Sequence, residues 1–241
     1  MKRLAIIAVC MLALRAAGQF GALAVSQMGG NWWDGLGLTS VWAMDDASGT
    51  TASDSVSGNN ATFSGSPVWT NLDGVVSVYF TANPQYLTAG TPANLNIRTN
   101  LTVCTWAYIS PSQITTFARI IEKESIWSII TRLVTQPHFF GSGLDVTVGV
   151  AGDFPSSEWI HIAYTFDGTG IRAYVNGVYK TFTALVGLLS DDSAIPFTMG
   201  NRVTGSRQFI GAVADVAVGR NCATSNDVAT IYDRSKSRYG K

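Results

Sequence analysis

Residues 158–180 read EWIHIAYTFDGTGIRAYVNGVYK, and this stretch decides the fold. It contains two candidate tight turns, Asp167-Gly168 and Asn176-Gly177, each lying between runs rich in aromatic and β-branched residues. Asp-Gly and Asn-Gly readily adopt the positive φ angles that two-residue hairpin turns require. The stretch therefore predicts two consecutive β-hairpins.

On either side of this stretch, short apolar runs rich in Thr and Val recur, separated by Gly, Asn, Asp and Pro. Such runs are typical of strands, and their regular spacing is typical of a β-sandwich or barrel. One late helix is expected, because Thr224 and Asp227 form a capping-box pattern ahead of an apolar face. The candidate strands are 75–80, 85–89, 101–109, 117–123, 126–134, 144–152, 159–166, 171–182, 196–201 and 209–219.

The composition excludes several classes of protein. The chain has 241 residues, 46% of them hydrophobic and 13% charged, which is enough apolar material for a real core. Sixteen basic residues balance sixteen acidic ones, so no net charge draws the protein to nucleic acid, and no nucleic-acid partner is expected. The spacing of the three cysteines excludes a Cys-type zinc site. Cys104 and Cys222 are either one disulfide or two free thiols.

The N-terminal segment, residues 1–30, is apolar and differs from the rest of the chain. An eleven-residue apolar run from Leu4 to Leu14 follows a basic pair. The run is short for a stable membrane span and suits either a secretion signal or a helix that packs in an assembly. We expect one domain at 31–241, with the N-terminal segment as a signal peptide or an assembly helix.

Catalytic signatures are mostly absent. The chain has no nucleophile elbow, no phosphate-binding loop and no zinc-protease motif. His161 lies inside a strand pattern and is expected to be a satisfied core histidine. Glu122 and Glu124 alternate onto one strand face, as a glycosidase pair would, but an exposed face with ion-pair neighbours explains them better. Asp45 and Asp46 would point to opposite sides of a strand and cannot act on one atom.

A calcium site is the more plausible chemistry. In the stretch SDSVSGNN, the side chains of Asp54, Asn59 and Asn60 lie around a glycine turn. Ca²⁺ prefers several oxygen ligands, commonly carboxylates mixed with amide and backbone carbonyls. The alternative is a turn in which the aspartate satisfies the backbone of its own loop.

In order and spacing, these stretches resemble the concanavalin A-like, laminin-G-type family over roughly residues 38–232. The resemblance rests on VWAMDDASGTTASDSVSGNNAT, VYFTANPQYLTAG, LTVCTWAYI, EWIHIAYTFDGTGIRAYVNGVYK and FIGAVADVAVGRNCATSNDVATIYD. It implies an all-β fold, an antiparallel β-sandwich jelly roll with one short C-terminal helix. It also implies structural Ca²⁺ held by Asp54, Asn59 and Asp215. The chain lacks the E-x-D-x-x-E motif of the related glucanases, so no enzyme activity is expected.

The resemblance implies a recognition or adhesion module that is extracellular or secreted and binds carbohydrate, as a lectin does, or a protein surface. The candidate contact residues are Trp127, Phe139, Phe140 and Arg202, although aromatic residues of a sandwich usually fill its core. The alternative is a phage structural protein of the virion, such as a capsid decoration, tail or fibre component. Its partners would then be other virion proteins or further copies in a homo-oligomer.

Overall fold

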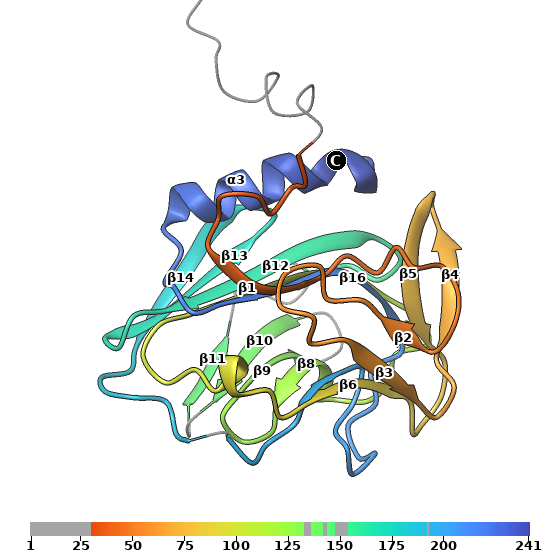
Figure 1. Cartoon of the computed structure of the whole chain (residues 1–241), viewed down its shortest axis with the longest axis horizontal. Coiled ribbons are helices and arrows are strands. Elements are labelled where there is room, and N and C mark those ends of the chain that lie inside the picture. Colours follow the sequence, from red (N-terminus) through yellow and green to blue (C-terminus); the bar gives the residue numbers. More distant parts are fainter. Residues whose placement is uncertain (1–29, 133–135, 142–143, 148–153, 192) are drawn as a thin grey trace, which may run out of the picture.

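The fold is a sandwich of two antiparallel sheets, seen in a computed structural model of the whole chain (Figure 1). The structure describes residues 30–241 except 133–135, 142–143, 148–153 and 192; the N-terminal segment therefore lies outside the described residues, apart from Gly30. The predicted all-β jelly roll with a short C-terminal helix is confirmed.

Sheet A carries the long strands recognised in the sequence. The two predicted hairpins form its edge, joined by turns in which Asn176 and Gly177 have φ angles of 50° and 75° and Gly168 has 82°. In order across the sheet, its strands are β14 (Val178–Ala184), β13 (Gly170–Val175), β12 (Trp159–Phe166), β7 (Leu101–Ile109), β16 (Gly211–Gly219), β5 (Val75–Phe80) and β4 (Val68–Leu72), with β1 (Leu38–Trp42) paired to β16.

Sheet B lies on the other side of the core and contains the shorter strands. A 3₁₀ turn, η1 (Ala93–Leu95), precedes the return of the chain to sheet A. The strands of sheet B, in order, are β11 (Leu144–Thr147), β10 (Gln136–Gly141), β9 (Trp127–Arg132), β8 (Ala118–Lys123), β15 (Phe197–Met199), β6 (Tyr86–Gly90), β3 (Ala61–Ser64) and β2 (Thr51–Ala52).

The outer face of sheet A is covered by the C-terminal helix α3 (Ser225–Ser235) and the 3₁₀ turn η2 (Lys236–Tyr239) (Figure 1). The capping box is confirmed: Thr224 accepts a hydrogen bond from the Asp227 amide, and the Asp227 side chain accepts one from the Thr224 amide. Val228 and Ile231 are buried against sheet residues such as Cys104 and Tyr174. Sheet A is therefore buried on both faces over this area.

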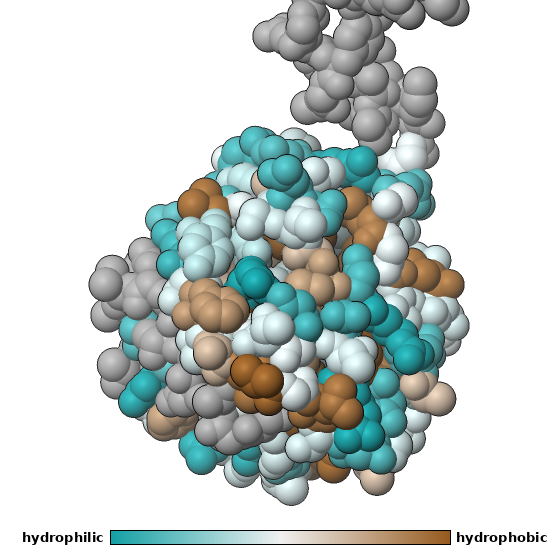
Figure 2. Space-filling model, turned by 90° about the vertical axis from the view of Figure 1, so that its left-hand side faces the viewer, coloured by the Kyte–Doolittle hydropathy of each residue, from teal (hydrophilic) through white to brown (hydrophobic). Residues whose placement is uncertain are grey.

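The free edge of sheet A is β14, whose side chains are the most exposed of any strand in that sheet. Tyr179 and Phe182 are roughly half exposed, and Figure 2 shows apolar groups interspersed with polar ones on this side of the molecule. The pairing register with β13 shifts so that Lys180 is an extra residue. A bulge and a lysine at a sheet edge both discourage pairing with a further strand.

The structure corrects one local expectation and decides one open alternative. The first strand ends at Trp42, so Asp45 and Asp46 lie in the following loop and not on a strand. Asp46 accepts hydrogen bonds from the amide and hydroxyl of Ser53. Cys104 and Cys222, for which a disulfide and free thiols were both open, are free thiols in this structure.

Candidate functional site

The two faces of sheet B carry different chemistry. Residues opposite one another on paired antiparallel strands share a face. One row of opposite residues, Leu87–Met199–Ile121–Ile129, belongs to the hydrophobic core. The adjacent row is offset by one residue on each strand and consists of Thr88–Thr198–Glu122–Ser128. The outer face of sheet B is therefore polar where the inner face is aliphatic.

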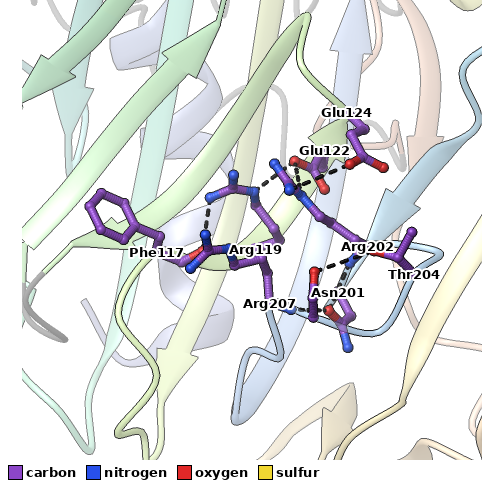
Figure 3. A network of polar contacts seen from close by, with 9 residues as sticks. Phe117, Arg119, Glu122, Glu124, Asn201, Arg202, Thr204 and Arg207 are labelled. Atoms are coloured by element: carbon purple, nitrogen blue, oxygen red, sulfur yellow. Dashed lines mark hydrogen bonds and ion pairs between the residues drawn. The ribbon is translucent and has the colours of Figure 1, made fainter.

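Glu122 lies at the centre of a charged network on this outer face (Figure 3). Its Oε1 accepts from Arg119 Nε at 2.6 Å and from Arg202 Nε at 3.1 Å. Arg202 Nη1 also lies 3.4 Å from Glu124 Oε1. The expectation of an exposed Glu122 is wrong, since its side chain is only 1% exposed, whereas that of Glu124 is 37% exposed.

Burial dominates the electrostatics of this network. The loss of water raises the pKa of Glu122 above its ordinary value, although the neighbouring guanidinium groups of Arg119 and Arg202 oppose the shift. Burial likewise lowers the pKa of Arg119. Glu122 Oε2 is buried and has no hydrogen-bond donor in the part of the chain that the structure describes. A buried acceptor without a donor is unusual and calls for an explanation.

The loop after β15 presents the outer arginines of the site. The buried Asn201 side chain accepts hydrogen bonds from the amides of Arg202 and Arg207, both at 2.8 Å. Phe117 lies beside the loop, with the Arg207 guanidinium 5.7 Å from its ring centre. The Phe117 carbonyl accepts from Arg119 Nη1 at 2.8 Å. The loop is thus tied down at both arginines, which holds their backbone in place.

The other contact candidates from the sequence lie elsewhere. Trp127 and Phe139 are buried in the core, as aromatic residues of a sandwich usually are. The side chain of Phe140 lies outside the described residues. Of the four candidates, Arg202 is the one that the structure places in the charged network. Arg207 and Phe117 were missed, because neither stands out in the local sequence.

The loop of Asp54 is held by hydrogen bonds from its own backbone. Asp54 Oδ1 accepts from the amides of Val41 and Val56, and Oδ2 from the amide of Asn59 at 3.0 Å. Asn60 Oδ1 in turn accepts from the Asp54 amide. These bonds match the backbone-turn alternative, and N–H groups pointing at a carboxylate occupy the positions a cation would take.

Asp215 takes part in a separate network under the C-terminal helix. It lies at a bulge of β16 with φ of 45° and is buried. Its Oδ1 accepts from Trp32 Nε1 at 3.1 Å and from Arg238 Nη1 at 2.6 Å, and its Oδ2 accepts from the Tyr239 hydroxyl at 2.7 Å. Burial raises the pKa of this carboxyl group above its ordinary value. Asp215 therefore joins Trp32 near the start of the domain to its C-terminal end.

As arranged here, Asp54, Asn59 and Asp215 do not form a suitable ligand set for Ca²⁺, because their carboxylate oxygens already face N–H, O–H or guanidinium donors. Among the described residues, no group of three or more His, Cys, Asp or Glu side chains could hold a metal ion. Calcium binding by these residues stays a prediction of the sequence.

His161 is buried on β12, as expected, beside the stacked rings of Trp106 and Tyr232. It is not satisfied, because neither ring nitrogen has a hydrogen-bond partner within the described ranges. Burial lowers the pKa of His161 to about 3. The imidazole is therefore neutral at ordinary pH and serves as a packing group.

Comparison with known proteins places the chain in a family. The family model described as concanavalin A-like lectin/glucanases superfamily matches residues 81–229, more than half of the chain. A comparison with curated protein sequences gives no match. Within the described residues, no helix has both the length and the apolar character needed to cross a membrane.

Three solved structures illustrate the likeness. Domain 4 of AbnA, an extracellular GH43 arabinanase from Geobacillus stearothermophilus in complex with arabinotriose, has 17% identity and a TM-score of 0.62, covering 81% of this chain and 98% of that domain. The botulinum neurotoxin serotype D ligand-binding domain in complex with N-acetylneuraminic acid has 14% identity and a TM-score of 0.63, covering 83% of this chain. Trypanosoma rangeli sialidase in complex with sialic acid has 13% identity and a TM-score of 0.64, covering 85%.

The present chain spans 51% of the toxin chain and 34% of the sialidase chain. At such low identities, the three structures share the fold with this protein and nothing finer. The assignment to the family rests on the match over residues 81–229, and the two-sheet sandwich described above agrees with that assignment. The protein belongs to the concanavalin A-like lectin/glucanases superfamily.

Proposed function

We propose that this protein is a non-catalytic carbohydrate-binding module and that glycan binds on the outer face of sheet B, at Arg202 and Glu124. The observation that carries the proposal is the charged network around Glu122 on that face. Arg202 is 18% exposed and contacts both glutamates, so it is the group through which a ligand would engage the network.

Stability alone is a weak reason for such a network. Removing a carboxylate and a guanidinium from water costs several kcal/mol per ion, by order of magnitude, and a buried ion pair regains this only with excellent geometry. Glu122 is nearly fully buried, yet its Oε2 has no donor in the described part of the chain. A hydroxyl-bearing ligand that moved the Arg202 side chain could donate to this oxygen.

The chemistry of the site suits sugars. Each sugar hydroxyl both donates and accepts, and adjacent carboxylate and guanidinium groups offer one partner of each kind. Charge-assisted hydrogen bonds of this type are roughly twice as strong as neutral ones. The partly buried ring of Phe117 adds an apolar surface beside them.

The fold likeness supports the same class of ligand. The arabinanase domain was solved with arabinotriose, and the toxin domain with N-acetylneuraminic acid. These proteins share the fold at low identity, so they support carbohydrate as a class and leave the sugar open.

We infer binding without catalysis. A glycosidase needs one carboxyl group free to donate a proton and a second on the other side of the scissile bond. Glu122 is engaged by two guanidinium groups, and Glu124 by one of the same two. Both carboxylates are therefore held as ion-pair partners of Arg202.

We also propose that the module works outside the cell, as expected from the family resemblance. A place in a virion remains the alternative prediction. The mass of the mature protein separates the two: loss of about two dozen N-terminal residues, as in a cleaved signal peptide, supports secretion. An intact Met1 in purified virus particles would instead support the virion prediction.

The direct test of function is glycan-array screening followed by calorimetry on the best ligand. Arg202→Ala and Glu124→Gln are compared with Lys236→Ala, which removes an exposed ion pair at the C-terminal turn on the helix side. We expect Arg202→Ala to weaken binding at least about tenfold, the loss of one charge-assisted hydrogen bond. The control should bind as the wild type does. Absence of glycan binding, or equal binding by all variants, would overturn the proposal.

A further inference from the structure

We infer that the site selects glycans that carry a carboxylate, such as sialic or uronic acid residues, and that Arg207 anchors this carboxylate. The inference rests on the proposed carbohydrate function and names the class of sugar. It follows from the lack of a carboxylate partner for Arg207 in the described part of the chain and from the way in which Arg207 is held.

Arg207 differs from Arg119 and Arg202 in having no carboxylate partner among the described residues. Arg119 and Arg202 are paired with Glu122, and Arg202 also with Glu124. Arg207 makes no ion pair with any carboxylate in the described ranges, and its guanidinium lies over the Phe117 ring, as does that of Arg132. The positive charge of Arg207 is therefore open to an anion from outside the chain.

The spare charge is close enough to the others to interact with them. Both Arg202 and Arg207 act electrostatically on Arg119, adding to the effect of burial on that side chain. Repulsion among guanidinium groups in a partly dry site is relieved when an anion binds between them. A ligand carboxylate would provide that relief, and a neutral sugar would not.

The acidic groups of the network lie towards one end of the site. Figure 3 shows Glu122 and Glu124 towards one end of the network and Phe117 at the other, with Arg119 between them. A ligand carboxylate would be repelled by the glutamates and attracted to the end where Arg207 packs on Phe117. The hydroxyl groups of the same sugar would then face Glu124 and Arg202.

Arg207 is held in place before any ligand arrives. Asn201, which is buried, accepts hydrogen bonds from the amides at both ends of the 202–207 loop. Asn201 is fixed in turn by its amide nitrogen, which donates to Gln208 Oε1 at 2.9 Å. The guanidinium stacks on Phe117, which limits its freedom. A planar guanidinium restrained in this way loses less entropy when it binds a carboxylate.

A solvated surface arginine is the alternative explanation of Arg207. Such a residue would attract any polyanion equally and would lose that attraction in salt. A specific binding site would instead distinguish a sugar with a carboxylate from the same sugar without one. The guanidinium group would make this distinction by donating two parallel hydrogen bonds to the carboxylate.

The test uses matched glycans measured by calorimetry with the full chain: sialyllactose against lactose, and an oligosaccharide of glucuronic acid against one of glucose. We expect the acidic member of one pair to bind about tenfold more tightly than its neutral counterpart, the value of one charge-assisted contact. The pair that shows this ratio identifies the source of the carboxylate. Arg207→Gln should bring the ratio close to one, because it weakens binding of the acidic glycan much more than binding of the neutral one.

Arg220→Gln is the matched control, because it removes an exposed arginine that follows β16. It should keep the wild-type ratio, and both variants should keep the wild-type melting temperature. Equal binding of acidic and neutral glycans by the wild type, or an unchanged ratio in Arg207→Gln, would overturn the inference and leave the proposed function standing. A wild type that binds none of the four glycans would overturn the inference, whereas the proposed function is decided by the array as a whole.

Discussion

Replacing Asp215 with Ala tests the network that ties Trp32 to the C-terminal turn. The change removes the acceptor for three donors: Trp32 Nε1, the Tyr239 hydroxyl and Arg238 Nη1. Trp32 and Tyr239 are 8% and 6% exposed, so water cannot readily replace the lost acceptor. Arg238 has a side chain that is 34% exposed, and its guanidinium can be rehydrated.

The magnitude follows from these contacts. A buried donor left without a partner costs about 1–3 kcal/mol, and two remain here. Alanine at a left-handed φ costs roughly a further 1–2 kcal/mol, and residue 215 has φ of 45°. Because such terms are not additive, we expect a total of about 3–5 kcal/mol, as when one partner of a buried ion pair is removed. For a domain of this size, that loss lowers Tm by roughly 10 °C.

The assay is urea unfolding at fixed pH, with Tm from calorimetry. Asp215→Asn should lose less, about 1–2 kcal/mol, because Asn keeps one acceptor oxygen and tolerates a left-handed φ. Asp233→Ala, which breaks an exposed ion pair with Lys236, should leave the free energy of unfolding close to that of the wild type. If Asp215→Ala lost no more than Asp233→Ala, the reasoning would be refuted.

The same series tests the calcium prediction. The hydrogen-bonded network requires the Asp215→Ala loss to be equal in calcium and in chelator, because Arg238 supplies the positive charge. A calcium site that included Asp215 requires a loss that appears only with calcium present. The two outcomes therefore distinguish an internal guanidinium from an external ion.

Two further predictions concern parts of the fold away from the site. The pKa of His161 is lowered to about 3 in the folded protein. Between about pH 6.5 and pH 3 the imidazole is therefore protonated in the unfolded chain and neutral in the folded one. The free energy of unfolding consequently decreases as the pH is lowered through this range. His161→Phe should remove up to about 1.4 kcal/mol per pH unit of this slope in urea unfolding between pH 4 and 6; an unchanged slope would contradict the assignment. Thr224→Ala should cost about 1 kcal/mol by loss of the N-cap of α3, whereas Thr224→Ser should cost much less in the same assay.

The sequence was sufficient wherever structure depends on neighbouring residues. The Asn176-Gly177 turn and the capping box of Thr224 were both predicted, because each is made by residues close together in the chain. The strands β3 and β4 were missed, because Ala61–Ser64 and Val68–Leu72 are short runs flanked by Gly, Asn, Ser, Pro or Asp residues typical of loops. Pairing with β6 and β5 makes them strands, and that pairing is a tertiary effect.

The candidate site was less predictable for the same reason. Glu122 stands in a strand pattern that fits an exposed position, and Arg202, which contacts it, lies 80 residues away in the chain. That Arg207 has no ion pair among the described residues becomes visible only in the folded structure, where Glu122 and Glu124 are paired with other arginines. Asp215 was singled out as a calcium ligand together with Asp54 and Asn59, and its observed partners are Trp32, Arg238 and Tyr239.

The most direct measurement of the central claim is a crystal structure with the best glycan from the array bound. We predict that the sugar lies on the outer face of sheet B, within hydrogen-bond distance of Arg202 and Glu124, with any carboxylate at Arg207. A sugar found instead on the exposed side chains of β14, or at the loop of Asp54, with the network around Glu122 unchanged, would contradict the claim.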